Sequence, residues 1–349
     1  MPRHGGDIYS FQKQEKPLLD FSANINPLGV PDVLRSAIVN VVDFLVHYPD
    51  PAQRRLRQAL AEFHGKTPEQ IVCGNGGADV IFRTVRAVSP SHALIPVPAF
   101  SEYAAALAEI GCRVTYWKMP FPYQLDETIL KALECGSYDF LALCNPNNPT
   151  GTVAGKEYMR GLIEHNPQVC FIIDQSYEFF TLCPLFSPAE AAEYPNVLLL
   201  HSMTKRYAIP GLRLGYVTGS SGLLERLRTN RMPWSVNRLA IEAGLFLLEN
   251  DVPEPLDVAA YLQETARLGK ALKAVGGLDV WDTQTHFMLV QLRMGKASAL
   301  KEYLAGEHGM LIRDASNFAG LDERFFRIAT QTPEENDRLV AAIEEFMAG

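Results

Sequence analysis

Polar residues suited to binding and chemistry follow several short apolar runs of the chain. A glycine-rich segment, Gly74–Ala78, overlaps the end of the run IVCG, and a polar loop, 145–151 (NPNNPTG), follows FLALC. Asp174 ends the run FIID, and Lys205 comes three residues after the run VLLLHS. A glycine-rich turn at a helix start can bind phosphate, a carboxylate can hold a proton, and a lysine amine can attack a carbonyl carbon.

Each of these features has an ordinary explanation when it is taken alone. Asp174 could cap a helix, Lys205 could be solvated, and the glycine-rich and polar segments could be simple turns. Tyr177, however, lies three residues after Asp174, and Arg213 lies eight residues after Lys205. Because ligands bind beyond the carboxyl ends of strands in open α/β sheets, the ordered set predicts one binding site.

The apolar runs predict the strands that position these residues. Each run has four to six residues, is rich in Val, Ile, Leu or aromatic residues, and is bounded by Gly, Pro or Asn. Most are expected to be strands buried on both faces, and helical patterns such as 78–88 lie between them. This alternation predicts an α/β fold with a mainly parallel sheet. The predicted strands are 71–74, 93–97, 113–117, 140–144, 169–174, 197–202 and 214–219.

The pattern changes after about residue 250. The acidic stretch NDVPEPLD leads into a helical pattern near 257–275. Further strands are expected at 278–282, 286–292, 310–313 and 325–329. We therefore predict an N-terminal arm and joining segment (1–44), a large α/β domain (45–245) and a smaller α+β domain (246–349).

The composition of the 349 residues excludes several classes of protein. Apolar residues make up 47% and charged residues 21%, which excludes disordered, collagen-like and coiled-coil chains. The net charge of −8 argues against a nucleic-acid binder. No apolar run could span a membrane and the first residues lack a signal-peptide pattern, so we expect a cytoplasmic enzyme. The six cysteines form no CxxC pair, so we expect small core residues rather than disulfides or a metal site.

The ordered strand ends resemble those of the fold-type-I pyridoxal-phosphate enzymes, in the aminotransferase class that includes histidinol-phosphate aminotransferase. The resemblance covers essentially the whole chain and implies pyridoxal 5'-phosphate as the cofactor. It implies that Lys205 binds the cofactor covalently, that Asp174 keeps the ring nitrogen protonated, and that Tyr177 donates to the phenolic oxygen. These three are the predicted catalytic residues. The other residues that the resemblance assigns to the cofactor are Gly77, Ala78, Phe100, Asn148, Ser202, Thr204 and Arg213.

The same resemblance assigns a role in the active site to two more residues, Arg327 and Tyr48. Arg327, in FFRIAT, matches the arginine that pairs with the substrate α-carboxylate, although alone it could be a solvated charge on an edge strand. Tyr48, in HYPDP, matches a tyrosine that reaches the cofactor phosphate of the other subunit, although alone it could be an ordinary half-buried side chain. The resemblance therefore implies a homodimer with shared active sites.

Three segments narrow the resemblance within this class. HGG at 4–6, SANINPLG at 22–29 and MPWSVN at 232–237 resemble the threonine-phosphate decarboxylase family of cobalamin biosynthesis. That family implies a small phosphorylated amino acid as the substrate. The HGG segment alone could equally be a loose chain terminus.

The narrower resemblance also implies the substrate site. The residues placed there are His4, Gly5, Asn24, Asn148, Arg313 near the phosphate, and Arg327 at the carboxylate. One departure concerns position 331, where Gln331 stands in place of an expected basic residue. The phosphate is therefore expected to be bound more weakly or by a different set of residues.

The reaction itself stays open between several alternatives. The leading one is decarboxylation of L-threonine O-3-phosphate to (R)-1-amino-2-propanol O-2-phosphate and CO2, and serine phosphate, which lacks one methyl, is a second substrate candidate. Histidinol-phosphate aminotransferase uses the same residues and differs in which bond at Cα is held perpendicular to the cofactor ring. A cofactor-binding regulator without turnover is the third alternative, and the intact set of Lys205, Asp174, Tyr177 and Arg213 argues against it.

Overall fold

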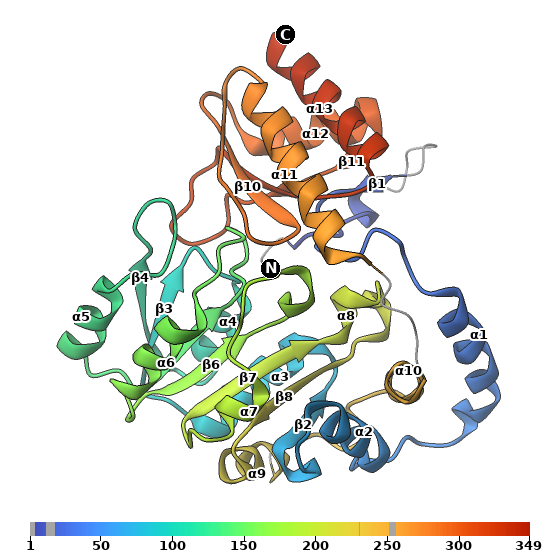
Figure 1. Cartoon of the computed structure of the whole chain (residues 1–349), viewed down its shortest axis with the longest axis vertical. Coiled ribbons are helices and arrows are strands. Elements are labelled where there is room, and N and C mark those ends of the chain that lie inside the picture. The colour runs from blue at the N-terminus through green and yellow to red at the C-terminus, as the bar shows by residue number, and fades with distance from the viewer. Residues whose placement is uncertain (1–3, 12–17, 230, 251–255) are drawn as a thin grey trace.

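The computed structural model describes residues 4–11, 18–229, 231–250 and 256–349. Its centre is a seven-stranded sheet in the order β2-β8-β7-β6-β5-β3-β4 (Figure 1). The strands from β7 to β4 are parallel, whereas β8 is antiparallel to both of its neighbours. This sheet confirms the predicted α/β class. The strands are β2 Ile71–Gly74, β3 His92–Val97, β4 Arg113–Lys118, β5 Phe140–Cys144, β6 Cys170–Asp174, β7 Val197–Ser202 and β8 Gly215–Gly219.

Helices cover both faces of this sheet, because alternate side chains of a strand point to opposite faces. Ala142 and Ile172 pack on one face with residues of α3, α4 and α9. Leu143 and Ile173, one position further along the same strands, pack on the other face with residues of α5, α6 and α7. The helices are α3 Gly76–Val88, α4 Glu102–Glu109, α5 Thr128–Cys135, α6 Lys156–Glu164, α7 Pro188–Ala191 and α9 Ser221–Thr229.

Three helices pack together beside the β2 edge: α1 (Asp32–Val41), α2 (Arg54–His64) and α10 (Arg238–Glu249). Leu245 and Leu247 of α10 belong to one apolar cluster with residues of α2 and β2. The predicted domain boundary at 245/246 therefore falls inside a helix, and the packing of the large part continues past that boundary. Helix α1, predicted within the arm, packs on α10 through the same cluster.

The C-terminal part contains an antiparallel sheet in the order β12-β13-β10-β9, with α11, α12 and α13 packed on it. The predicted strand 310–313 is divided between two sheets, because β11 pairs with β1 whereas β12 pairs with β13. The parallel β1–β11 pair attaches the N-terminal segment to this part. The elements are β1 Leu19–Asp20, α11 Val258–Ala274, β9 Leu278–Val280, β10 Phe287–Leu292, α12 Ala297–His308, β11 Met310–Leu311, β12 Arg313–Asp314, β13 Phe325–Ala329 and α13 Pro333–Ala348. The remaining short helices are α8 Met203–Arg206, η1 Tyr9–Phe11, η2 Val42–Val46, η3 Pro68–Gln70, η4 Glu178–Phe180 and η5 Pro210–Leu212.

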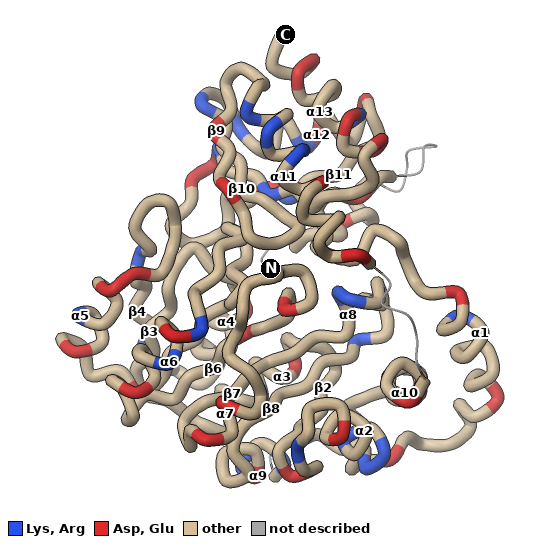
Figure 2. The backbone as a smooth tube through the Cα atoms, viewed as in Figure 1, with Lys and Arg blue, Asp and Glu red and all other residues tan. Residues whose placement is uncertain are grey.

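Charged residues lie mainly on the outer helices and loops, where acidic and basic residues are interspersed (Figure 2). The central strands β5 to β8 carry a single charged residue, Asp174. Every helix in the described ranges is too short or too polar to span a bilayer. All six cysteines are free, but only Cys73 and Cys144 are buried and Cys135 is exposed, so the expectation of core positions is wrong for Cys135.

Candidate active site

The polar residues predicted from the strand ends meet at the carboxyl edge of the central sheet. Asp174 ends β6, and α8 carries Lys205 directly after β7. The loop after β5 brings Asn148 to the same place, and the start of α3 brings Gly77. The cofactor residues predicted from this chain's own subunit all line one cavity: Gly77, Ala78, Phe100, Asn148, Asp174, Tyr177, Ser202, Thr204, Lys205 and Arg213.

Asp174 is a buried carboxylate whose two oxygens both accept hydrogen bonds. The backbone N–H of Ser176 donates to Oδ1 at 2.9 Å, and the Tyr103 hydroxyl donates to Oδ2 at 2.7 Å. Burial raises the pKa of Asp174, whereas the two donors and the nearby Lys205 ammonium oppose that rise. The donors therefore favour the ionised carboxylate that a protonated ring nitrogen needs as a partner.

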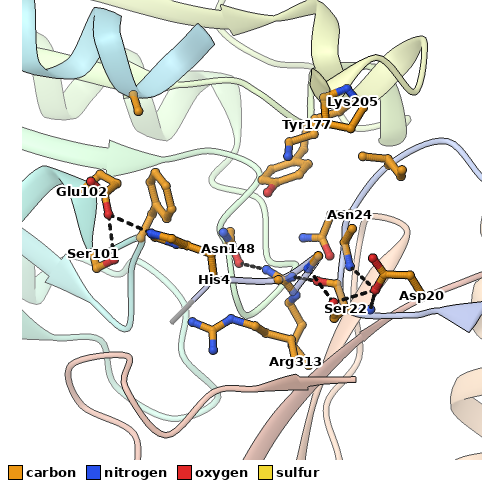
Figure 3. Close-up of a pocket in the computed structure, with 18 of the residues that line it drawn as sticks. His4, Asp20, Ser22, Asn24, Ser101, Glu102, Asn148, Tyr177, Lys205 and Arg313 are labelled. Carbon is orange, nitrogen blue, oxygen red and sulfur yellow. Dashed lines mark hydrogen bonds and ion pairs between the residues drawn. The ribbon is translucent and has the colours of Figure 1, made fainter. Parts of the chain in front are cut away.

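The Lys205 amine faces the cavity from α8, close to Tyr177 (Figure 3). Desolvation lowers the pKa of Lys205 from 10.5 to about 8, and repulsion from Arg327 and Arg213 adds to this effect, while Asp174 opposes it. Only an unprotonated amine is a nucleophile. The environment therefore makes Lys205 a better nucleophile near neutral pH than an exposed lysine.

The turn from β2 into α3 presents backbone amides to the same cavity. Gly76 has φ +83°, and a Cβ there would lie 2.4 Å from Nη2 of Arg213. A side chain at this position would therefore displace the guanidinium from the turn. A helix N-terminus beside a guanidinium is a binding site for a phosphate group, and Gly77, Ala78 and Arg213 line it here.

A larger cavity of about 620 Å³ opens beside Lys205 and Tyr177 (Figure 3). The structure brings all of the predicted substrate residues to its wall: His4, Gly5, Asn24, Asn148, Arg313 and Arg327. The residues come from the N-terminal segment, the loop after β5 and the C-terminal sheet, which are far apart in the sequence.

Arg327 is buried in β13, directly opposite Arg313 of β12. Because β13 lies between β12 and β10, the alternative of a solvated edge-strand charge is wrong. The guanidinium donates to Oδ1 of Asn148 and to the Ser22 carbonyl, while its Nε has no hydrogen-bond partner among the described residues. This geometry leaves a planar, positioned cation at the cavity wall.

Arg313 adds a second cation next to Arg327. Its guanidinium donates to Oδ1 of Asn317 at 2.7 Å and to the Asp314 carbonyl. Burial, with repulsion from Arg327, lowers the pKa of Arg313 to about 9. These hydrogen-bond partners are neutral oxygens, so the two positive charges favour an anionic ligand in the cavity.

Asn24 and the N-terminal residues complete the wall. Asn24 is 2% exposed, and its Oδ1 and Nδ2 lie near Tyr177 but make no well-formed hydrogen bond within the described part of the chain. Buried amides are normally satisfied, so this pair of atoms points to a ligand. Nε2 of His4 lies 3.2 Å from Oε1 of Glu102, and both residues line the cavity.

Two of the residues singled out from the sequence lie elsewhere. Tyr48 is 80% exposed and packs against Trp234 with ring centroids 4.9 Å apart and the rings tilted, and it lines neither cavity. Gln331 donates from Nε2 to the Asp20 carbonyl at 3.1 Å, which holds it against β1 rather than in the substrate cavity.

Sequence analysis missed three residues that support the site: Tyr103, Glu102 and Ser22. Tyr103 and Glu102 lie at the start of α4, just after Phe100, and Ser22 holds Arg327 through its carbonyl. Their closeness to residues already singled out was the only available signal. It does not reveal which distant group each side chain contacts.

Comparisons with known proteins agree with this geometry. The model of the family "Aminotransferase class I and II" matches residues 16–343, so the chain belongs to that family. The chain is 35% identical to threonine-phosphate decarboxylase of Salmonella typhimurium, over 99% of this chain and 97% of the relative. The crystal structure of L-threonine-O-3-phosphate decarboxylase from Porphyromonas gingivalis has a TM-score of 0.88 and 33% identity, covering 94% of this chain and 99% of that one. The histidinol-phosphate aminotransferase structure from Clostridium acetobutylicum has a TM-score of 0.86 and 28% identity, with coverage of 95% and 99%.

Proposed function

We propose that the protein is a pyridoxal-phosphate-dependent decarboxylase of L-threonine O-3-phosphate, acting in cobalamin biosynthesis. The observation that carries the proposal is the pair of buried arginines, Arg313 and Arg327, in adjacent strands beside Lys205. Threonine phosphate carries two anionic groups, a carboxylate and a phosphate. Arg327 is assigned to the carboxylate and Arg313 to the phosphate, and the similarity to threonine-phosphate decarboxylases supports the same substrate.

The cavity at the sheet edge has the groups that pyridoxal phosphate requires. Lys205 would hold it covalently, Asp174 would hold the ring nitrogen, and Gly77, Ala78 and Arg213 would hold the phosphate. When bound, the cofactor supplies a conjugated ring that accepts the electron pair left on the substrate when a bond at Cα breaks. Because Gly76 has no Cβ, the Arg213 guanidinium can lie against this turn, which supports the fit.

The residues of the chain then have separate roles in the reaction. Arg327 binds the substrate carboxylate and orients it, and Asn148, which accepts a hydrogen bond from Arg327, keeps that guanidinium in place. Tyr103 and Ser176 donate to the Asp174 carboxylate and so favour its ionised form. After CO2 leaves, the Lys205 ammonium can deliver a proton to Cα, which balances the loss of the carboxylate.

A product assay tests the proposal against its main alternative. Purified holoenzyme should release CO2 from threonine phosphate without a keto acid and should form 1-amino-2-propanol phosphate. Serine phosphate and histidinol phosphate are tested in parallel. Amino transfer from histidinol phosphate that strictly requires 2-oxoglutarate, with no CO2 from threonine phosphate, would instead support the histidinol-phosphate aminotransferase reaction.

The proposal includes a homodimer with shared sites. Tyr48 contacts Trp234, and the segments 39–48 and 232–234 carry further exposed apolar side chains, whose exposure favours association with another protein surface. These side chains are Val39, Val42, Phe44, Leu45, Val46 and Met232. Because Tyr48 lines neither cavity of its own subunit, its role at the cofactor phosphate would be in the partner. Sedimentation analysis tests the dimer directly, since a monomer at working concentration would reject it.

A further inference from the structure

We propose that Glu102 is a positioning residue that holds His4 at the mouth of the substrate cavity, where the His4 imidazole completes the binding site for the substrate phosphate. The inference rests on the proposed function and extends it to a residue outside the sets assigned above. Glu102 acts through His4 and makes no contact with the substrate itself.

Both residues line the substrate cavity, where they contact each other. Nε2 of His4 lies 3.2 Å from Oε1 of Glu102, and the His4 ring lies 5.8 Å from the ring of Phe100 (Figure 3). The Ser101 hydroxyl lies 3.4 Å from the same Glu102 oxygen. Glu102 engages Nε2, so Nδ1 is the ring nitrogen that we assign to an anion in the cavity.

The backbone after His4 packs closely against Ser22. A Cβ on Gly5 would lie 2.1 Å from the Ser22 carbonyl oxygen, so only glycine fits there. The N–H of Gly6 donates to Oγ of Ser22 at 2.7 Å, and the Ser22 carbonyl accepts from Arg327. The segment from His4 to Gly6 therefore bridges α4 and the arginine-bearing sheet.

The charges explain why the pair has to act together. Glu102 lines a cavity that also contains Arg313 and Arg327, and its side chain is 15% exposed. A carboxylate at this place would repel a phosphate dianion if nothing stood between them. With His4 docked, its imidazole pairs with the Glu102 carboxylate, so that carboxylate supports phosphate binding instead of opposing it.

This reasoning predicts that removing the Glu102 charge has opposite effects in two backgrounds. In the otherwise unchanged enzyme, Glu102→Gln should weaken binding of a phosphate ligand by roughly tenfold, because His4 loses its charged partner. His4→Ala should weaken it by roughly 100-fold, because a donor is lost and Glu102 is left unneutralised. The double variant His4→Ala/Glu102→Gln should bind roughly tenfold more tightly than His4→Ala alone.

The experiment uses the holoenzyme and isothermal titration calorimetry with phosphoethanolamine, which has the amine and the phosphate but no carboxylate to lose. Inorganic phosphate serves as a second probe. Glu109→Gln is the matched control, because Glu109 ends the same helix in an exposed pair with Arg86 and should leave both affinities unchanged. Cofactor absorbance and melting temperature, measured for every variant, show that folding and cofactor binding are intact.

The reversal of sign is the result that supports the inference, because a merely structural Glu102 would act in the same direction in both backgrounds. Equal effects in the two backgrounds, no effect of Glu102→Gln, or no binding of either probe to the unchanged enzyme would overturn it. Failure of the proposed function looks different. In that case the unchanged enzyme would bind phosphoethanolamine with the sign reversal intact but release no CO2 from threonine phosphate.

Discussion

Replacing Lys205 by Met should make the cofactor-free protein more stable at neutral pH. The lysine is confined with Arg327 and Arg213, and desolvation is the largest cause of its low pKa, from 10.5 to about 8. Below pH 8 both the folded and the unfolded chain carry the proton, so the folded state bears the full cost of the buried charge. That cost disappears as the pH rises through 8 to 10.5, because the folded chain loses its proton first. Met is an unbranched residue of similar length that carries no charge.

The pKa difference sets the magnitude of the effect. It corresponds to about 3 kcal/mol at pH 7 and about 1 kcal/mol at pH 10, and the pH 7 value is an upper bound because Lys205 is only partly buried. Urea unfolding of the cofactor-free proteins, followed at both pH values, measures the difference in the free energy of unfolding. Lys131→Met, at an exposed lysine of α5, is the control and should show no pH-dependent gain. A Lys205→Met protein that is less stable at pH 7, or whose gain is the same at pH 10, would refute the reasoning.

Four further outcomes are expected. Borohydride reduction of the holoenzyme should leave the cofactor attached to Lys205 in peptide mapping, and attachment to a different lysine would contradict the site. Asp174→Asn should keep the cofactor but slow CO2 release by roughly three powers of ten, because the ring nitrogen loses its anionic partner; near-normal kcat would count against this role. Removal of residues 1–6 should raise KM for threonine phosphate while cofactor absorbance stays unchanged, and unaltered kinetics would mean that the segment is dispensable. Equal mixing of inactive Lys205→Ala and Tyr48→Phe subunits should restore about a quarter of wild-type activity, since half of the dimers then hold one intact site. No recovery in confirmed mixed dimers, with Tyr48→Phe shown to be impaired alone, would place Tyr48 in its own subunit's site.

The central sheet and the cofactor cavity were predictable because their signals are local. Each strand is a short apolar run, and most of the predicted cofactor residues lie at or just after the end of such a run, whereas Arg213 comes just before β8, which runs antiparallel to its neighbours. In a parallel sheet these ends lie along one edge, so the order Gly77, Asp174, Lys205, Arg213 implies one cavity before any contact is known. The domain boundary at 245/246 was less predictable, because α10 extends past it and only packing shows which part of the chain it joins.

The supporting contacts were decided by the tertiary structure alone. Tyr103 donates to a carboxylate 71 residues away, and Arg327 donates to a carbonyl 305 residues away. No periodicity or spacing within one segment encodes such pairs, since they depend on how separate elements pack. The burial of Arg327 also depends on the fold. On an edge strand its charge would be solvated, but β13 lies between two other strands and Arg327 is buried there. The amino-acid sequence by itself determined which chemical groups reach the sheet edge, and the fold decided which of them are held, neutralised or left for a ligand.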